Sequence, residues 1–218
     1  FNEDSLAFEF DETNLMRANK FPGFDLYEGG QRLNTGLRAT VRYDNGFNGT
    51  VLVGRSFRRE QDDVFTLRTG LRPKASDWVI AARADMPGVS AYVRSRLDND
   101  TGAVRRFEAG ADVSKRWGSG SIRYLRDNLD ISGVKQENLD ARGQLNLTKN
   151  WAVSVYGARD LRTDVWRRRD IGVVYTDDCV RVELIYQRQD QFTNTPLGRT
   201  LRNNDSVVVR LTLATLGG

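Results

Sequence analysis

The chain has 218 residues and a net charge of +4, with 28% charged residues, 39% hydrophobic residues, one cysteine and no histidine. Without histidine, Ser-His-Asp and Cys-His catalysis and histidine-based zinc sites are excluded within this chain, so we expect neither an enzyme nor a cofactor or metal site. The basic residues are spread along the sequence without a recognised nucleic-acid module, and we expect no nucleic-acid partner. No apolar run approaches the ~18 residues of a transmembrane helix.

Apolar residues occupy every second position in one segment after another, which is the pattern of half-buried β-strands. In the segment 33–43, for example, Leu37 and Val41 alternate with Arg38 and Arg42. We expect about twelve strands, near residues 4–10, 31–43, 47–58, 77–87, 89–98, 103–117, 119–128, 136–147, 151–162, 165–176, 179–190 and 205–216.

The linkers between these strands alternate in length. Short turns such as YDNGF, WGSG and TKN take turns with longer linkers such as RREQDDVFTLRTGLRPKAS and QFTNTPLGRTLRNN. Strands of about ten residues with short turns at one end and longer loops at the other are typical of an outer-membrane β-barrel. In an aqueous β-sandwich, the alternative, loop length need not follow the end of the sheet. The sequence favours an all-β, antiparallel transmembrane barrel of the outer membrane.

Aromatic residues sort to the two strand ends, as in the girdles of membrane barrels. Beside the short turns lie Tyr43, Phe47, Trp117, Trp151 and Tyr175, and at the opposite ends lie Phe57, Trp78 and Trp166. Short turns belong on the periplasmic side, so we expect Cys179 at the periplasmic end. The aperiodic stretch 10–32 is then a cell-surface loop or a loop folded back into the lumen.

Along the strands, one of the two alternating sets of positions, or phases, is rich in arginine. An arginine at a lipid-facing midplane position costs about 2–4 kcal/mol, so we expect the apolar phase to face lipid and the charged phase to face a lumen. The arginines expected in the lumen are Arg32, Arg38, Arg42, Arg83, Arg94, Arg96, Arg142, Arg181 and Arg210. Such a wall suits an anionic or amphipathic passenger, or else it is only a hydrated wall of arginine–acid pairs.

A second set of arginines falls on the apolar phase, high above the short turns. It comprises Arg55, Arg105, Arg126, Arg159, Arg167 and Arg169. At about 3.3 Å per residue and a tilt of about 45°, their height is that of the outer headgroup region. We expect an outer-leaflet belt that binds lipid phosphates, such as those of lipopolysaccharide, with ordinary snorkelling as the alternative.

The segment FDETNLMRANKFPGFDLYEGGQRLNTGL at 10–37, preceded by NEDS at 2–5, resembles the LptD family of lipopolysaccharide-assembly outer-membrane proteins. The resemblance rests on Phe10, Asp11, Asn14, Phe21, Gly23, Asp25, Glu28, Gly29 and Gly30. A later DDCV segment followed by two strands matches the family more loosely. The aperiodic stretch is thus similar to the signature loop of that family.

The resemblance implies a barrel of about 26 strands, of which residues 1–218 would be the C-terminal portion. The N-terminal barrel half and a periplasmic jellyroll would be absent from this chain, and a first residue that is Phe1 rather than Met agrees with a partial chain. The function implied is lipopolysaccharide transport and insertion into the outer leaflet of a Gram-negative outer membrane. The partners implied are lipopolysaccharide, an LptE-like lipoprotein plug and an LptA-like periplasmic bridge.

The resemblance also implies roles for the C-terminal residues. The last strand would form one edge of a lateral gate, with Val207, Val209, Leu211 and Leu213. Cys179 would form a disulfide with the N-terminal periplasmic region. Asp178 stands where many members of the family have a second cysteine, which leaves room for one such disulfide.

Two other interpretations stay open. A self-contained porin or specific channel of about twelve strands would share the cationic lumen but leave Cys179 free. A barrel hydrolase of the outer membrane is disfavoured, because such enzymes usually need a histidine base and the chain has none.

Overall fold

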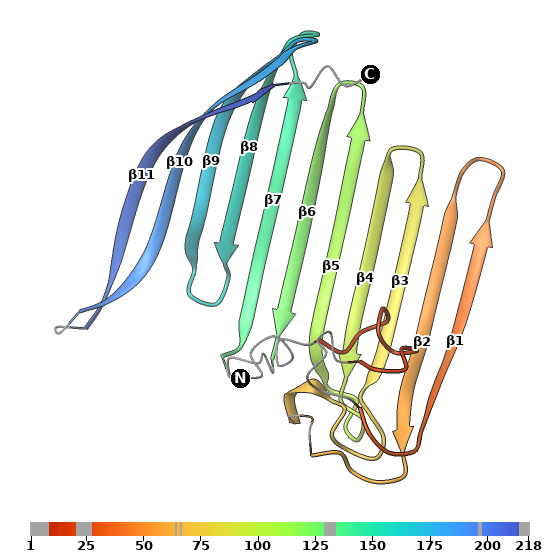
Figure 1. The fold of residues 1–218 in the computed structure, drawn as a ribbon. Helices are drawn as coiled ribbons and strands as arrows, with labels where there is room; N and C mark the ends of the chain where they lie inside the picture. The colour runs from red at the N-terminus through yellow and green to blue at the C-terminus, as the bar shows by residue number, and fades with distance from the viewer. Residues whose placement is uncertain are drawn as a thin grey trace. The chain divides into compact units, whose positions relative to one another are not determined.

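The computed structural model of the protein describes residues 9–20, 28–63, 65, 67–128, 134–195 and 198–213. These residues form one sheet of eleven strands, in which each strand pairs with its neighbours in sequence (Figure 1). The strands are β1 (Arg32–Arg42), β2 (Asn48–Arg58), β3 (Trp78–Met86), β4 (Val89–Leu97), β5 (Val104–Lys115), β6 (Gly118–Asp127), β7 (Gln136–Asn146), β8 (Trp151–Asp160), β9 (Val165–Thr176), β10 (Val180–Thr195) and β11 (Gly198–Leu213). A short 3-10 helix, η1 (Leu67–Thr69), lies between β2 and β3. The predicted all-β, antiparallel fold is confirmed.

Helices contribute little to this fold. Within the described ranges, none is long and apolar enough to cross a membrane.

The strand predicted at 4–10 is not observed where the structure can test it. Residues 1–8 lie outside the described residues, and Glu9 and Phe10 belong to no strand. Phe10 is instead 1% exposed in an apolar cluster. Burial of this aromatic ring therefore holds the segment against the sheet without strand pairing.

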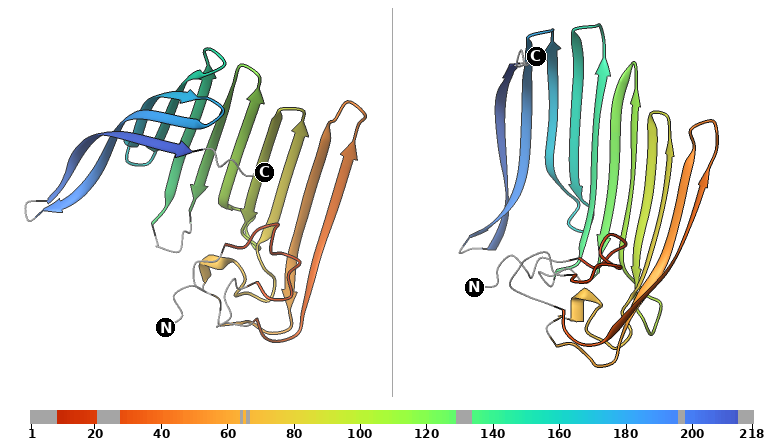
Figure 2. Two further views of the ribbon diagram at one scale, coloured as in Figure 1. Left: turned by 45° about the horizontal axis from the view of Figure 1, so that its top comes forward. Right: turned by 45° about the vertical axis from the view of Figure 1, so that its right-hand side comes forward.

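The long loop predicted at 191–204 is wrong. β10 continues to Thr195 and β11 begins at Gly198, and the two strands stay paired to their ends. The pairing of β10 with β9 ends earlier, at Gln189 opposite Arg168. Beyond that rung the two strands satisfy each other's backbone groups as a hairpin, which Figures 1 and 2 show extending past β9.

The chain divides into two compact units, residues 1–109 with 125–136 and residues 110–124 with 137–218. Within each unit, cross-strand register sorts the side chains onto two faces, because successive residues of a strand point to opposite sides of the sheet.

In the first unit, one row of facing residues runs from Arg38 to Leu52, Ala81 and Arg94 across β1 to β4. This row and those in phase with it make up what we call the charged face. The opposite, apolar face leaves large side chains exposed, namely Leu33, Leu37, Val41, Val51, Phe57, Trp78 and Val93.

The second unit repeats this division. A row on its charged face runs from Arg142 to Tyr156, Asp170 and Gln187 across β7 to β10. Its apolar face exposes Leu145, Trp151, Val155, Ile171, Val173, Leu184, Tyr186, Val207, Val209, Leu211 and Leu213. In an aqueous fold such surfaces would be covered, so exposed apolar rows of this extent indicate contact with lipid.

Residues 9–20, which we call the strap, pack on the charged face of the first unit. A buried apolar cluster joins the strap to β2, β3 and the connection 59–77, and consists of Phe10, Leu15, Leu52, Phe65, Leu71 and Val79. Figure 1 shows the strap and η1 together at the end of the sheet opposite the short turns of this unit. The core of the unit thus lies between its own loops and its charged face.

Candidate functional site

The strap is tied to the charged face by ion pairs. Arg94 Nε lies 2.6 Å from Glu12 Oε1. Glu9 lies 3.3 Å from guanidinium nitrogens of both Arg96 and Arg106. These arginines come from β4 and β5, so the strap bridges two neighbouring strands.

A notch between β1 and β2 receives the side chain of Leu15, which is fully buried. The notch exists because Gly36 and Gly54 lie opposite each other in the register. A Cβ atom at Gly54 would lie 2.5 Å from Leu15 Cδ2 and 2.5 Å from the carbonyl oxygen of Thr35. Glycine at this position is therefore required for the close approach of the strap.

The end of the strap is anchored by a buried charge cluster around Glu28. Lys20 Nζ lies 3.2 Å from Glu28 Oε1, and both side chains are fully buried. Arg58 Nη2 also contacts Glu28 Oε1, and Arg32 Nη1 lies 3.7 Å from Glu28 Oε2. Lys20 Nζ donates a further hydrogen bond to Asn34 Oδ1 at 3.2 Å. Burial lowers the pKa of Lys20, and the charge of Glu28 opposes this shift. Removing the Glu28 carboxylate would leave the buried Lys20 ammonium without an acid among the described residues.

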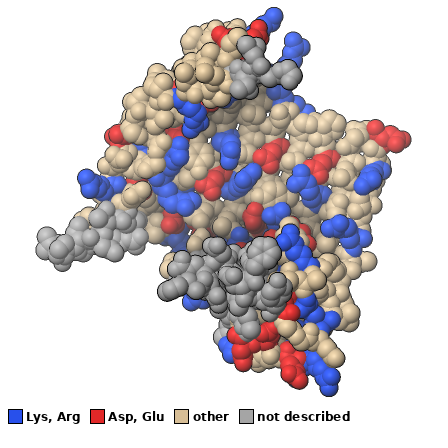
Figure 3. All heavy atoms as spheres, in the orientation of Figure 1, with Lys and Arg blue, Asp and Glu red and all other residues tan. Residues whose placement is uncertain are grey.

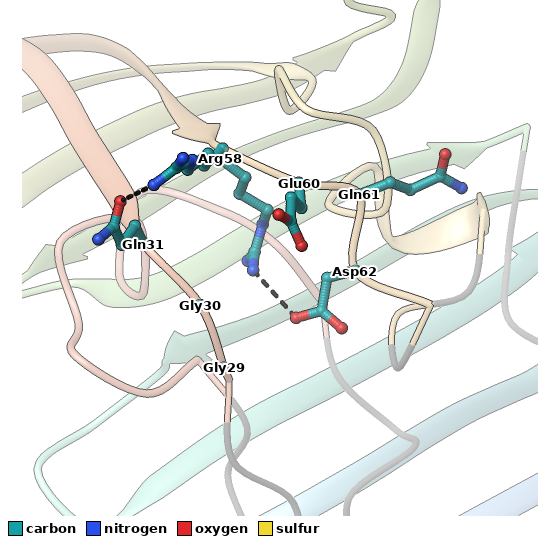
Figure 4. A pocket seen from close by; sticks show the side chains of 8 residues that line it. Gly29, Gly30, Gln31, Arg58, Glu60, Gln61 and Asp62 are labelled. Carbon is teal, nitrogen blue, oxygen red and sulfur yellow. Dashed lines mark hydrogen bonds and ion pairs between the residues drawn. The ribbon is translucent and has the colours of Figure 1, made fainter.

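A pocket of about 470 Å³ opens beside this cluster. Figure 4 shows the Arg58 side chain pointing to Asp62 next to the backbone of Gly29 and Gly30, and Arg58 Nη1 lies 3.1 Å from Asp62 Oδ2. The lining also includes Gln31, Arg59, Glu60 and Gln61. The lining offers guanidinium donors and carboxylate acceptors, so this pocket can hold a small polar group.

Asp77 joins the connection 59–77 to β4 and β5. Its Oδ2 lies 3.0 Å from Arg105 Nη1 and 3.5 Å from Arg96 Nε. Burial raises the pKa of Asp77 to about 6, against the opposing charges of Arg105 and Arg96. Arg105 also pairs with Asp98. The pKa of Asp98 is lowered to about 2, mainly because the backbone N–H of Thr101 donates a hydrogen bond to its carboxylate.

The arginines predicted to line a lumen lie on the charged face of their unit. Figure 3 shows basic and acidic side chains interspersed on the surface turned to the viewer. Arg83 Nη2 lies 2.6 Å from Asp85, and Arg181 and Arg210 each lie 2.8 Å from Glu183. Most of this arginine charge is therefore neutralised locally.

Arg38, Arg42 and Arg142 differ from the other arginines predicted to line a lumen. All three are exposed, and none forms an ion pair with a residue that the structure describes. They are three cations of these faces that remain available to a passenger.

The arginines predicted to form an outer belt have varied surroundings. Carboxylates pair with several of them, in the pairs Arg105–Asp98, Arg159–Asp164, Arg167–Asp140 and Arg169–Asp190. Arg55 lies between two aromatic rings, and Arg126 is exposed.

A β-bulge changes the phase of Arg167. The register of β8 and β9 shifts between Ala158 and Arg159. Arg167 Nη2 lies 3.6 Å from Asp140 Oδ1, and Asp140 also accepts a hydrogen bond from the Tyr156 hydroxyl at 3.4 Å. Because Tyr156 belongs to the charged face, Arg167 reaches that face and not the apolar face expected from strict alternation.

The C-terminal residues of interest lie in the second unit. Val207, Val209, Leu211 and Leu213 are 61–67% exposed on the apolar face of β11, the last strand of the sheet order. Cys179 is a free, exposed thiol in the turn between β9 and β10.

The structure describes six of the nine residues on which the family resemblance rests. Phe10, Asp11 and Asn14 belong to the strap, where the backbone N–H of Asp11 donates to Asn14 Oδ1 at 3.1 Å. Glu28 centres the buried cluster, and Gly29 and Gly30 line the pocket beside it. Phe21, Gly23 and Asp25 lie outside the described residues.

Several site residues were not predicted from the sequence. Glu9, Glu12 and Lys20 come from segments whose partners no periodic pattern indicates. Arg58 could have been found, since it shares the phase of Leu52 on β2. No group of three or more acidic or cysteine side chains among the described residues is placed to hold a metal ion.

Comparison with known proteins gives one finding. A family model described as LptD, LPS transport system D, matches residues 1–151. No curated protein matches the chain significantly.

Proposed function

The chain belongs to the LptD family of lipopolysaccharide-transport proteins of the Gram-negative outer membrane, and from this premise we propose that its charged faces line a lumen through which lipopolysaccharide passes to a lateral gate. Membership of this family supports a role in lipopolysaccharide transport and assembly at the outer membrane. The path through the barrel, the gate and the partners are the finer steps of the proposal.

The observation that carries the proposal is the division of each unit into a charged face and an exposed apolar face. In the first unit Leu37 is 71% exposed on one face, while Arg38, its neighbour in sequence, belongs to the other. An arginine facing hydrocarbon at the midplane would cost about 2–4 kcal/mol. The apolar faces therefore suit lipid, and the charged faces suit a hydrated interior.

The charged faces suit a passenger that is both anionic and rich in hydroxyl groups. Arg38, Arg42 and Arg142 can meet phosphates, because no acid among the described residues neutralises them. Lipopolysaccharide carries phosphates and sugars, so arginine together with carboxylates fits it better than a purely cationic wall would. The strap, seated on the charged face of the first unit, would then narrow the lumen.

Residues 1–218 would form the C-terminal portion of a larger barrel. In that arrangement, β11 forms one edge of the lateral gate, and Val207, Val209, Leu211 and Leu213 are its lipid-facing side chains. The barrel would hold an LptE-like plug, and an LptA-like bridge would dock on a periplasmic domain outside this chain. Cys179, exposed in a turn, would pair with a cysteine of that domain, and gel mobility of the native protein with and without reductant is the check.

The transport path is tested by removing three arginines that form no ion pair with a described residue. We expect the triple variant Arg38→Gln, Arg42→Gln, Arg142→Gln to slow the arrival of newly made lipopolysaccharide at the cell surface by on the order of tenfold, since hydrogen bonds between charged groups are worth about 1.5–3 kcal/mol. Pulse labelling with a surface-accessibility assay measures the rate. None of these substitutions removes an ion pair from a carboxylate that the structure describes, so folding should be preserved.

The matched control is Arg116→Gln with Lys149→Gln, which removes exposed charges from short turns outside the strands. The control should transport as the parent protein does. Equal rates in both variants, with equal amounts of assembled protein, would contradict a lumen that uses these arginines.

A further inference from the structure

Arg55 stands apart from the other arginines of the predicted belt. Ion pairs with carboxylates hold Arg105, Arg159 and Arg169. Arg55 on β2 makes no ion pair with any acid that the structure describes, although it is half-buried. A half-buried cation without an anion is costly, so its surroundings must stabilise it or leave room for an anion.

Two aromatic rings and one carbonyl fix the position of the Arg55 guanidinium. Its Cζ lies 4.6 Å from the Trp78 ring centroid and 5.1 Å from that of Phe57. Nη2 donates a hydrogen bond to the backbone oxygen of Ser76 at 2.9 Å. Contact with both rings positions the guanidinium without neutralising its charge.

The guanidinium keeps unused donors. The one hydrogen bond from the guanidinium to a described residue is that of Nη2 to Ser76, so Nη1 is left for a ligand, whereas Nε is buried and out of a ligand's reach. Ser76 neutralises no charge, because its contact with Arg55 is made by a neutral carbonyl. The site therefore presents a pre-oriented positive charge that still lacks its counter-ion.

The surroundings indicate what kind of anion fits. Two residues before Arg55, on the same face, Val53 pairs with Leu37, whose side chain is 71% exposed. On the other side, Phe57 pairs with Leu33, which is 63% exposed. A water-soluble anion would gain nothing from this apolar surface, whereas the acyl chains of a lipid would cover it.

We propose that Arg55, held between Trp78 and Phe57, binds the phosphate group of an outer-leaflet lipid on the outside of the sheet. Bidentate contact between guanidinium and phosphate is the geometry that arginine favours. The proposal rests on the proposed orientation, in which the apolar face meets lipid. It adds a binding site on the outer surface to the transport path through the lumen.

The test uses the complete protein purified from outer membranes with its bound partners. The probes are bisphosphorylated lipid A, chemically dephosphorylated lipid A and phosphatidylglycerol, titrated in detergent and followed by native mass spectrometry. We expect Arg55→Gln to weaken binding of bisphosphorylated lipid A by about tenfold. Arg116→Gln, which removes an exposed arginine from a short turn, is the matched control and should bind as the parent does.

The lipid arms identify the source of the phosphate. Weaker binding of bisphosphorylated lipid A alone assigns the site to the glycolipid, and an equal loss for phosphatidylglycerol assigns it to lipid phosphates in general. Arg55→Gln that binds both phosphorylated lipids as the parent does would overturn the proposal. Equal affinity of the parent protein for bisphosphorylated and dephosphorylated lipid A would overturn it too. Arg55→Lys keeps the charge but loses the planar guanidinium. We expect its affinity for bisphosphorylated lipid A to lie between those of the parent and Arg55→Gln.

Transport is read separately, by surface arrival of lipopolysaccharide in cells. Weaker lipid binding with normal transport supports this site and leaves the lumen proposal standing. Slower transport in Arg55→Gln with parental lipid binding counts against the site.

Discussion

At the scale of single residues, Gly54 shows how closely the strap fits the sheet. We expect Gly54→Ala to destabilise the protein by about 1–3 kcal/mol, since overpacking forces neighbours to move. The new Cβ would lie 2.5 Å from the carbonyl oxygen of Thr35, which is backbone and cannot rotate away, and 2.5 Å from Leu15 Cδ2. Thermal unfolding of the purified protein, followed by circular dichroism, measures the change.

Gly120→Ala is the matched control for this substitution. A Cβ at Gly120 would have its nearest neighbours, Arg142 O and Val113 Cγ1, at 3.5 Å, an ordinary contact. If Gly54→Ala melts at the same temperature as Gly120→Ala, Leu15 does not occupy the notch between β1 and β2.

The phase of most site residues was predictable, but their partners were not. Alternation placed Arg94 and Arg96 on the charged phase, and the structure has them there. Their partners Glu12 and Glu9 come from the strap, whose path over the sheet is set by burial of Phe10 and Leu15 and leaves no period in the sequence. Pairing between a strand and an irregular segment is a tertiary property, and a single sequence does not encode it in any local pattern.

At the scale of elements, the strap is a separate piece held to the sheet by charge as well as by burial. Arg94→Glu would place a carboxylate beside Glu12 and near Glu108, which lie 2.6 Å and 3.9 Å from Arg94. We expect repulsion to release the strap and to raise the rate of tryptic cleavage after Arg17, an exposed strap residue. Mass spectrometry of timed digests of the purified protein measures cleavage at this bond.

The charge-swapped variant Glu12→Arg with Arg94→Glu restores an opposite-charge pair and should recover part of the protection. Arg210→Glu is the control, because it adds the same charge beside Glu183 on the charged face of the second unit, to which the strap does not belong. Cleavage that rises equally in Arg94→Glu and Arg210→Glu would show that the Glu12–Arg94 pair does not hold the strap.

The strands were predictable where one face is apolar and the other polar, and the prediction failed where that contrast fades. Residues 191–204 carry Thr, Asn, Pro and Gly, which resemble a loop, yet most of them form the hairpin of β10 and β11. Pairing between two strands satisfies the backbone whatever the side chains are. The bulge that redirects Arg167 is likewise invisible in the alternation, because it inserts one residue without changing composition.

At the scale of the whole molecule, the fold class followed from a property that both units share. Each has a face with exposed apolar rows and a face with arginines and acids, and period-two alternation records this division directly in the sequence. The observed order of the eleven strands is the simplest one, because each strand pairs with its neighbours in sequence. What local patterns do not record is the charge balance within a face, since ion pairs form between residues distant in the chain.

If the apolar faces meet lipid, the two faces of one strand must differ sharply in their tolerance for charge. Leu184 lies on the apolar face of β10 between Val173 and Val209 and is 51% exposed. Leu184→Arg should cost about 2–4 kcal/mol in the hydrocarbon and reduce the amount of heat-modifiable, assembled protein in outer membranes. Gln187→Arg, on the charged face of the same strand and opposite Asp170, should assemble normally because it adds a cation beside a carboxylate. In an aqueous sheet both variants would assemble, since an exposed Leu184 would then tolerate charge freely. Equal assembly of the two variants would therefore exclude lipid contact at this face, and with it the placement of the charged face in a lumen.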